Sequence, residues 1–111
     1  DSTISVHQLK AMLEARDRGE QSFELIDVRE PNEWDISRIP GSVLIPKGEI
    51  LAGKAFDRLP QDTQLVLHCK SGIRSAEALA VLKGAGYADA VHVGGGVVAW
   101  VNQIDPSQPS Y

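Results

Sequence analysis

Short apolar runs alternate along the chain with longer stretches in which apolar residues recur at helical spacing. One such stretch follows Ser5, which has Gln8 three positions later, and this capping-box spacing predicts a helix that continues to Gly19. Another follows Gly72 and ends near Gly84. Its apolar positions are Ile73, Ala76, Leu79, Ala80 and Leu82. Shorter helices are predicted within 31–36, 47–59 and 97–102, and an irregular tail at 105–111.

Four segments have the length and composition of strands, at residues 25–28, 43–45, 64–69 and 90–93. The 64–69 segment is apolar without alternation, which is typical of a central parallel strand covered on both faces. Because strands and helices alternate, we expect an α/β domain with a mostly parallel central sheet. Functional residues of such sheets lie beyond the carboxyl ends of the strands, and Cys69 stands at one of these ends.

Composition favours a single domain and excludes several classes of protein. The chain has 111 residues, of which 42% are hydrophobic, and this length can bury one core without metals or disulfides. Its single cysteine excludes an internal disulfide, and with only three histidines the usual zinc ligands are missing. No apolar run reaches the roughly 18 residues of a membrane span. Because the sequence shows no secretory leader, we expect a cytoplasmic location.

The charge balance argues against a nucleic-acid partner. The net charge is −4, whereas binding to a phosphate backbone needs a concentrated basic face. Five acidic residues cluster within twelve positions: Glu24, Asp27, Glu30, Glu33 and Asp35. We interpret this cluster as a solvated rim.

The strongest chemical signal is a strand that ends at Cys69 and continues through a short polar loop into a helix. A loop that curls into a helix N-terminus directs its backbone N–H groups inward, where they bind an anion with the help of the helix dipole. Gly72 permits the backbone angles of such a curl. The loop also supplies two cations and two hydroxyls, from Lys70, Arg74, Ser71 and Ser75. We therefore expect the Cys69 thiol to have a lowered pKa and to act as a nucleophile at neutral pH.

Asp27 and Arg29 follow a neighbouring predicted strand, at the same edge of the sheet as Cys69. Two interpretations stay open for this pair: support of the Cys69 loop, or a structural ion pair. His68 and His92 fall within predicted strands, and we interpret both as structural histidines. The glycine-rich segment 94–99 matches a dinucleotide-binding spacing, but the strand and acidic residue that such a site needs do not follow it, so we interpret it as a turn.

The active-site loop of the rhodanese family, the single-domain sulfurtransferases, resembles the segment Cys69-Lys70-Ser71-Gly72-Ile73-Arg74-Ser75. Other segments agree with that family in order and spacing: Leu25 to Glu30 with Glu33-Trp34, Ile39 to Ser42, and Val93 to Trp100. The chain departs from the family at Ser37-Arg38, where Gly-His is frequent. The resemblance covers nearly the whole chain and implies a three-layer α/β/α rhodanese-like fold.

The resemblance also implies an activity. Cys69 would take sulfane sulfur from a small anionic donor such as thiosulfate, or from a desulfurase persulfide, and pass it from its own persulfide to an acceptor. Backbone N–H groups of residues 70–74 would stabilise the persulfide, and Lys70 and Arg74 would attract anionic donors and lower the thiol pKa. The substrate-binding set is Lys70, Ser71, Gly72, Ile73, Arg74 and Ser75. No cofactor or metal is required.

The end of the chain is similar to the C-terminal rhodanese domain of proteins that fuse an adenylyltransferase to a sulfurtransferase. The similar residues are Trp100 to Ile104, Asp105-Pro106 and Pro109-Ser110-Tyr111. Such fusions, of the molybdopterin synthase sulfurylase type, act on ubiquitin-like sulfur carriers for molybdopterin, thiamine, cysteine or thiolated-tRNA synthesis. We therefore expect residues 1–111 to be the excised C-terminal domain of a longer protein, which also fits the absence of an initiator Met.

Two other functions compete with sulfur transfer. Phosphatases and arsenate reductases also place Cys and Arg on such a loop, but phosphatases of the Cys-x5-Arg type have five residues between them, whereas four residues separate Cys69 from Arg74. The smaller loop suits one persulfide sulfur better than a phosphate. A non-catalytic rhodanese-like binding module is the second alternative, although such modules often lose the cysteine that this chain keeps.

Overall fold

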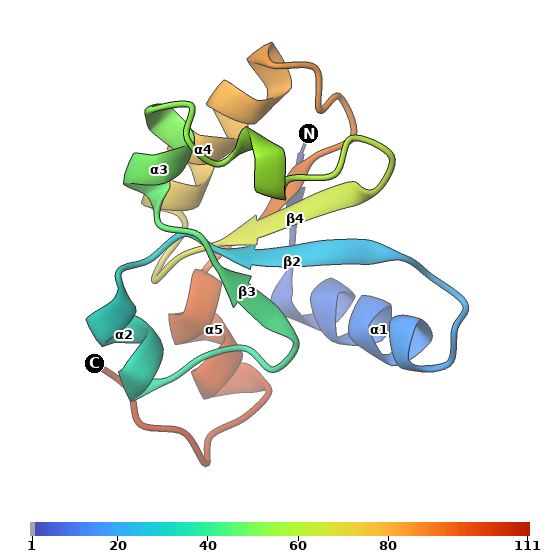
Figure 1. The fold of residues 1–111 in the computed structure, drawn as a ribbon. Helices are drawn as coiled ribbons and strands as arrows, with labels where there is room; N and C mark the ends of the chain where they lie inside the picture. Colours follow the sequence, from blue (N-terminus) through green and yellow to red (C-terminus); the bar gives the residue numbers. More distant parts are fainter. Residues whose placement is uncertain (1) are drawn as a thin grey trace.

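Five parallel strands form the centre of the molecule in the computed structural model, which describes residues 2–111 (Figure 1). They are β1 (Thr3–Ile4), β2 (Phe23–Asp27), β3 (Ser42–Leu44), β4 (Gln64–His68) and β5 (Val91–Val93). Their order in the sheet is β1-β5-β4-β2-β3, and all neighbouring pairs are parallel. The predicted parallel sheet is confirmed. Strand β1, which the sequence did not predict, adds an edge beside β5.

Helices cover both faces of this sheet, which confirms the three-layer α/β/α fold. They are α1 (Val6–Asp17), α2 (Pro31–Ile36), α3 (Lys47–Leu51), the 3-10 turn η1 (Phe56–Arg58), α4 (Ile73–Gly84) and α5 (Gly96–Gln103). Helices α1 and α5 lie on one face and α3 and α4 on the other, while α2 lies beyond the carboxyl ends of the strands (Figure 1). Within residues 2–111, no helix is both long and apolar enough to cross a membrane.

Local signals in the sequence explain where α1 begins. The Ser5 hydroxyl accepts a hydrogen bond from the Gln8 backbone N–H at 3.0 Å, and the Gln8 side chain accepts one from the Ser5 N–H at 2.7 Å. This reciprocal capping box satisfies N–H groups that have no partner within the helix. The predicted start of the helix is confirmed.

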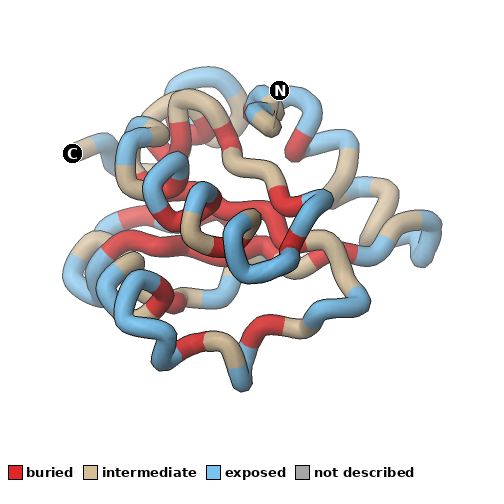
Figure 2. The backbone as a smooth tube through the Cα atoms, turned by 90° about the horizontal axis from the view of Figure 1, so that it is seen from above, coloured by how far each residue is buried: buried red, intermediate tan, exposed pale blue. Residues whose placement is uncertain are grey.

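The core has two parts, one on each side of the sheet. The central strands between them are buried along most of their length (Figure 2). Alternate residues of β4 belong to opposite parts, because successive side chains of a strand point to opposite faces. Leu65 and Leu67 pack toward α3 and α4, whereas Val66 packs toward α1 and α5. Because all three are fully buried, β4 is the covered central strand that its unbroken apolar pattern predicts.

The apolar spacing that predicts α4 identifies only part of its buried face, because Leu79 and Leu82 are buried but the other three predicted positions are not. Ile73 is 74% exposed, and the alanines at 76 and 80 are exposed as well. The buried positions are Ser75, Ala78, Leu79 and Leu82. The helix is oriented by its first turn, where the polar Ser75 faces the sheet and the larger, apolar Ile73 faces solvent.

The sheet order brings the ends of β2 and β4 together. The chain moves in one direction across the sheet from β2 to β3 and in the other from β4 to β5, so the connections diverge between β2 and β4. Parallel sheets bind ligands outside the carboxyl ends of the strands at such a reversal. Asp27 and His68 are register partners at these two ends, and Cys69 follows His68 directly.

Candidate functional site

The loop after β4 wraps around the sulfur of Cys69. The backbone N–H groups of Gly72 and Ser75 point at Sγ, with N–S distances of 3.1 and 3.4 Å. The Ser75 hydroxyl lies 3.6 Å from the same sulfur. Gly72 has φ +120°, a conformation that favours glycine, so the curl predicted from this residue is present. Cys69 is only 1% exposed and sits at the centre of a ring of donors.

These donors determine the charge state of the thiol. Burial raises the pKa of Cys69, but hydrogen bonds from the Ser75 hydroxyl and from the N–H groups of Ser75, Gly72 and Ser71 outweigh burial, so the pKa lies below its ordinary value. The ionised sulfur also attracts the Arg74 guanidinium, and this attraction helps to raise the pKa of Arg74. This lowered pKa of Cys69 agrees in direction with the thiolate that the loop sequence predicts.

The glycine turn between β5 and α5 holds the same loop from behind. The N–H groups of Val97 and Val98 donate to the carbonyls of Cys69 and Lys70 at 2.9 and 3.0 Å. Gly96 passes so close to these carbonyls that a Cβ on it would lie 2.3 Å from the Cys69 oxygen. The turn interpretation of residues 94–96 therefore omits a function, because this turn fixes the Cys69 loop in place.

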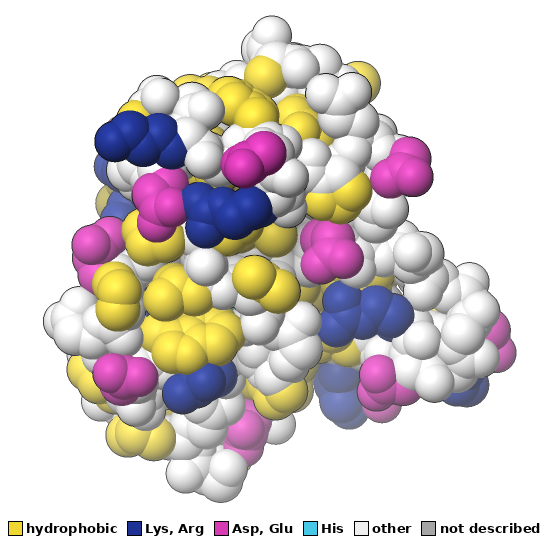
Figure 3. All heavy atoms as spheres, in the orientation of Figure 1, with side chains coloured by type: hydrophobic (Ala, Val, Ile, Leu, Met, Phe, Trp, Pro, Cys, Tyr) yellow, Lys and Arg dark blue, Asp and Glu magenta, His cyan; other side chains and the backbone are white. Residues whose placement is uncertain are grey.

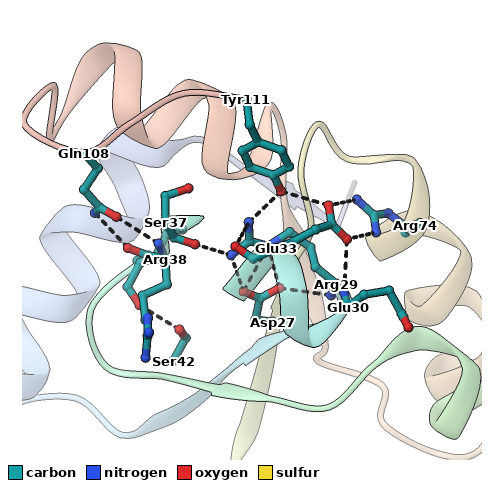
Figure 4. A network of polar contacts seen from close by, with 11 residues as sticks. Asp27, Arg29, Glu30, Glu33, Ser37, Arg38, Ser42, Arg74, Gln108 and Tyr111 are labelled. Atoms are coloured by element: carbon teal, nitrogen blue, oxygen red, sulfur yellow. Dashed lines mark hydrogen bonds and ion pairs between the residues drawn. The ribbon is translucent and has the colours of Figure 1, made fainter. Parts of the chain in front are cut away.

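Arg74 does not stand free above the loop. Its guanidinium donates to both carboxylate oxygens of Glu33, on α2, at 2.6 and 2.9 Å (Figure 4). The Arg74 hydrogen bonds lower the pKa of Glu33 to about 2, against its usual 4.5, and Glu33 in turn raises the pKa of Arg74. Glu33 belongs to the acidic cluster for which the sequence suggested a solvated rim. That interpretation is wrong for Glu33 and for the fully buried Asp27.

The Glu33 pKa predicts a loss of stability in acid. A carboxyl whose pKa is lower in the folded than in the unfolded chain stabilises the fold above the unfolded pKa, and that contribution disappears as the pH falls through the folded pKa. We expect the free energy of unfolding to decrease between about pH 4.5 and pH 2, and to decrease less steeply in Glu33→Gln. Urea unfolding followed across this range measures both slopes. Parallel pH curves for the two proteins would contradict the assignment.

Asp27 and Arg29 form an ion pair with both side chains fully buried. The guanidinium nitrogens Nε and Nη2 donate to the Asp27 carboxylate at 2.8 to 3.1 Å, and Nη2 also donates to the carbonyl of Ser37 at 2.6 Å (Figure 4). The sequence left two interpretations open for Asp27 and Arg29, support of the Cys69 loop or a structural ion pair, and the structure shows the ion pair. Through Ser37 it also ties the end of β2 to the end of α2, and a buried pair of this kind is costly to break.

The C-terminal tail returns to the site, which its irregular sequence did not predict. The hydroxyl of Tyr111 accepts from Arg29 at 2.6 Å and donates to Glu33 at 2.9 Å (Figure 4). The Lys70 ammonium lies 4.4 Å from the centre of the Tyr111 ring. Glu33 and Tyr111 thus join the two arginines of the site. Both residues lie in segments that carry the family resemblance, but nothing in the sequence indicates that they meet.

His92, interpreted from sequence as structural, contacts the site directly. Its Nδ1 lies 2.8 Å from the Ser75 hydroxyl oxygen, and its Nε2 lies 3.2 Å from the Thr3 hydroxyl. His68 differs from the half-buried His92 in being fully buried, and this burial lowers the pKa of His68 to about 4. Of the other predicted loop residues, Ser71 and Ile73 are exposed at the rim. Across residues 2–111 no cluster of three or more His, Cys, Asp or Glu side chains is placed to hold a metal ion.

Residues 5–103 match the family model described as a rhodanese-like domain. The chain is 49% identical over 110 residues to a probable adenylyltransferase/sulfurtransferase of Mycobacterium tuberculosis, MoeZ, with 99% of this chain and 27% of that protein covered. It is 33% identical to the adenylyltransferase and sulfurtransferase Uba4 of Ogataea parapolymorpha, with 100% and 26% covered. The chain thus spans about a quarter of the length of these relatives. A rhodanese-like domain protein of Staphylococcus aureus has a TM-score of 0.78 at 27% identity, with 100% and 99% covered.

Proposed function

The chain belongs to the rhodanese-like domain family, and from this membership and the geometry of its loop we propose that it is a sulfurtransferase that carries sulfane sulfur on Cys69. One observation carries the proposal: two backbone N–H groups and a hydroxyl converge on Sγ within 3.1 to 3.6 Å. Such a ring of donors stabilises an anionic sulfur, whether the thiolate or the outer sulfur of a persulfide. Phosphoryl transfer would require the same donors to enclose a much larger tetrahedral group.

The first step loads the protein. The Cys69 thiolate attacks the sulfane sulfur of the donor, so that a new S–S bond forms at Cys69 while the donor's bond to that sulfur breaks. With thiosulfate, sulfite leaves with the bonding electron pair. With a desulfurase persulfide, the desulfurase thiolate leaves. The backbone N–H groups of Gly72 and Ser75, which already bind the thiolate, then stabilise the persulfide anion.

The second step transfers the sulfur from the Cys69 persulfide to an acceptor. A nucleophile on the acceptor attacks the outer sulfur, and the Cys69 thiolate leaves with the electron pair of the S–S bond. The lowered pKa of Cys69 favours this step, because a more stable thiolate is a better leaving group. Both steps use only the loop and the sulfur, so the chain needs no metal or cofactor for them.

Lys70 and Arg74 are proposed to attract the donor anion toward the loop. They contribute unequally, because Glu33 binds the Arg74 guanidinium through two hydrogen bonds and compensates its charge. The Lys70 ammonium lies over the Tyr111 ring, a contact that leaves its charge uncompensated. The structural role of Arg74 is then to link α4 to α2 beside the sulfur, while Lys70 supplies more of the attraction.

Loading with thiosulfate tests the proposed function. After incubation with thiosulfate, we expect the intact mass of the protein to increase by one sulfur atom, reductant to remove this sulfur, and added cyanide to release it as thiocyanate. Protein alkylated at Cys69, its only cysteine, is the control and takes up no sulfur. Wild-type protein that takes up no sulfur after incubation with thiosulfate would contradict the proposal. In that case, hydrolysis of an aryl phosphate that alkylation abolishes would favour a phosphatase, and inactivity in both assays a binding module.

We further propose a sulfur-carrier protein as the acceptor. The relatives from Mycobacterium tuberculosis and Ogataea parapolymorpha are both named as an adenylyltransferase and a sulfurtransferase in one protein. In such a pairing one domain activates the C-terminus of a ubiquitin-like carrier, and the persulfide supplies its sulfur. The present chain would serve as the sulfur-supplying half in the cytoplasm, with an adenylyltransferase domain fused to it or bound as a partner.

A further inference from the structure

A row of hydrogen-bonding groups leads from the buried sulfur to the surface. The thiol of Cys69 lies 3.6 Å from the Ser75 hydroxyl, which lies 2.8 Å from His92 Nδ1, and His92 Nε2 lies 3.2 Å from the Thr3 hydroxyl. Cys69 and Ser75 are 1% and 0% exposed, His92 is half-buried and Thr3 is exposed. The four residues come from the β4 loop, α4, β5 and β1, so the tertiary fold aligns them.

The Ser75 hydroxyl is the critical member of this row, because it has only one hydrogen to donate. Three acceptors lie within reach of it: the ionised Cys69 sulfur, His92 Nδ1, and the carbonyl of Gly72 at 3.2 Å. If Nδ1 is the unprotonated nitrogen, it competes with the sulfur for the hydroxyl hydrogen. If Nδ1 carries the proton, it donates to the hydroxyl oxygen, and the hydroxyl hydrogen can turn to the sulfur.

We propose that Ser75 and His92 relay the thiol proton of Cys69 to the surface at Thr3, and that His92 is thereby a positioning residue for the sulfur transfer proposed above, on which this inference rests. In the thiol form, S–H donates to Ser75, the Ser75 hydroxyl to Nδ1, and Nε2–H to Thr3. In the thiolate form every bond in the row is reversed: Thr3 donates to Nε2, Nδ1–H to Ser75, and the Ser75 hydroxyl to the sulfur.

The protons balance in this exchange. Each of the first three groups passes one proton to the next, and one proton leaves the exposed Thr3 hydroxyl for water. The imidazole changes tautomer but stays neutral before and after. Burial lowers the pKa of His92 and thus disfavours an imidazolium. The two ring nitrogens face the hydroxyls of Thr3 and Ser75, and a Cβ on Gly72 would lie 3.9 Å from the ring carbon Cε1. The charged group that is attracted to the thiolate is Arg74.

Sulfur transfer would use the relay twice. The relay lets a thiol that is closed off from water lose its proton before the attack on the donor. In the second step the departing Cys69 thiolate meets a hydroxyl hydrogen that already points at it. His92 touches neither sulfur nor substrate in this scheme and acts through Ser75 alone.

The pKa of Cys69 gives the first test. Its thiolate is followed by ultraviolet absorbance against pH, with the Cys69→Ser variant subtracted as background. We expect Ser75→Ala to move the midpoint up by about one pH unit, the size of one lost hydrogen bond to a charged group. We expect His92→Leu to move it in the same direction but by less, because Ser75 keeps its hydroxyl and loses only the Nδ1–H donor that turns this hydroxyl toward the sulfur. His92→Asn, whose amide can donate to Ser75, should restore part of the shift. His7→Leu, a histidine substitution on the exposed side of α1, should leave the midpoint unchanged.

The tautomer of His92 gives the second test. In protein labelled with ¹⁵N at histidine, we expect the His92 ring to change from the Nε2–H to the Nδ1–H form with the same midpoint as the thiolate absorbance, and to show no such change in Cys69→Ser. An unchanged Cys69 midpoint in His92→Leu, an equal shift in His7→Leu, or a single His92 tautomer throughout would overturn the relay. None of these readouts requires a sulfur donor or sulfur transfer. Sulfur loading can therefore fail while the relay is confirmed, and the relay can fail while sulfur loading is confirmed.

Discussion

Replacing Gly96 with alanine is expected to destabilise the folded protein by about 3 kcal/mol or more and to abolish sulfur loading. Gly96 has φ +54°, and a Cβ at this position would lie 2.3 Å from the carbonyl oxygen of Cys69 and 2.5 Å from that of Lys70. Neither is the end of a flexible side chain. The backbone of the sulfur-binding loop must therefore move, and the hydrogen bonds that Val97 and Val98 donate to these carbonyls would be lost with it.

Gly84 provides the matched control for this substitution. It is the last residue of α4, its φ is not positive, and a Cβ on it would meet no atom within 4 Å. Alanine is the better helix former, so Gly84→Ala should be neutral or stabilising by up to about 1 kcal/mol. Urea unfolding and thiosulfate loading of both variants measure the contrast. A Gly96→Ala protein with wild-type stability and loading would show that the loop does not depend on this contact.

The sequence predicted those features that depend on neighbouring residues. The capping box of Ser5 and the apolar run of β4 are local, because a helix N-terminus and a buried strand are specified within a few residues. The position of Cys69 at the carboxyl end of β4, ahead of a helix, is local as well. The parallel sheet followed from the alternation of these elements, and the family resemblance added the three-layer arrangement.

The features that the sequence did not predict depend on contacts between distant residues. Strand β1 has only two residues, too few for a pattern, and exists because it pairs with β5. Glu33 meets Arg74 across 41 positions and Tyr111 across 78. His92 gains its partner, Ser75, only when α4 packs over β5. The inward orientation of Ser75 also explains why the apolar Ile73 faces solvent, against the expectation from helical spacing.

Replacing Cys69 with serine is expected to reduce thiocyanate formation to the uncatalysed background while leaving the fold intact. The serine oxygen can accept the same hydrogen bonds from Gly72 and Ser75, and the change affects a single buried atom, so we expect a stability loss of only about 1 kcal/mol. Catalysis differs because a serine hydroxyl does not ionise near neutral pH and cannot hold sulfur as a persulfide. Thermal unfolding and the cyanide assay, performed on the same preparation, separate the two effects.

The same variant distinguishes carrying sulfur from binding a partner. Cys69 is the only cysteine in residues 1–111, so no second thiol within this domain can resolve its persulfide to a disulfide, and the sulfur leaves to an acceptor outside the domain. Cys69→Ser should therefore block transfer to any acceptor, yet retain the surface on which a carrier protein docks. Wild-type rates of thiocyanate formation in this variant would place the sulfur on another group, and would remove the chemical basis for reading the loop as a sulfur carrier.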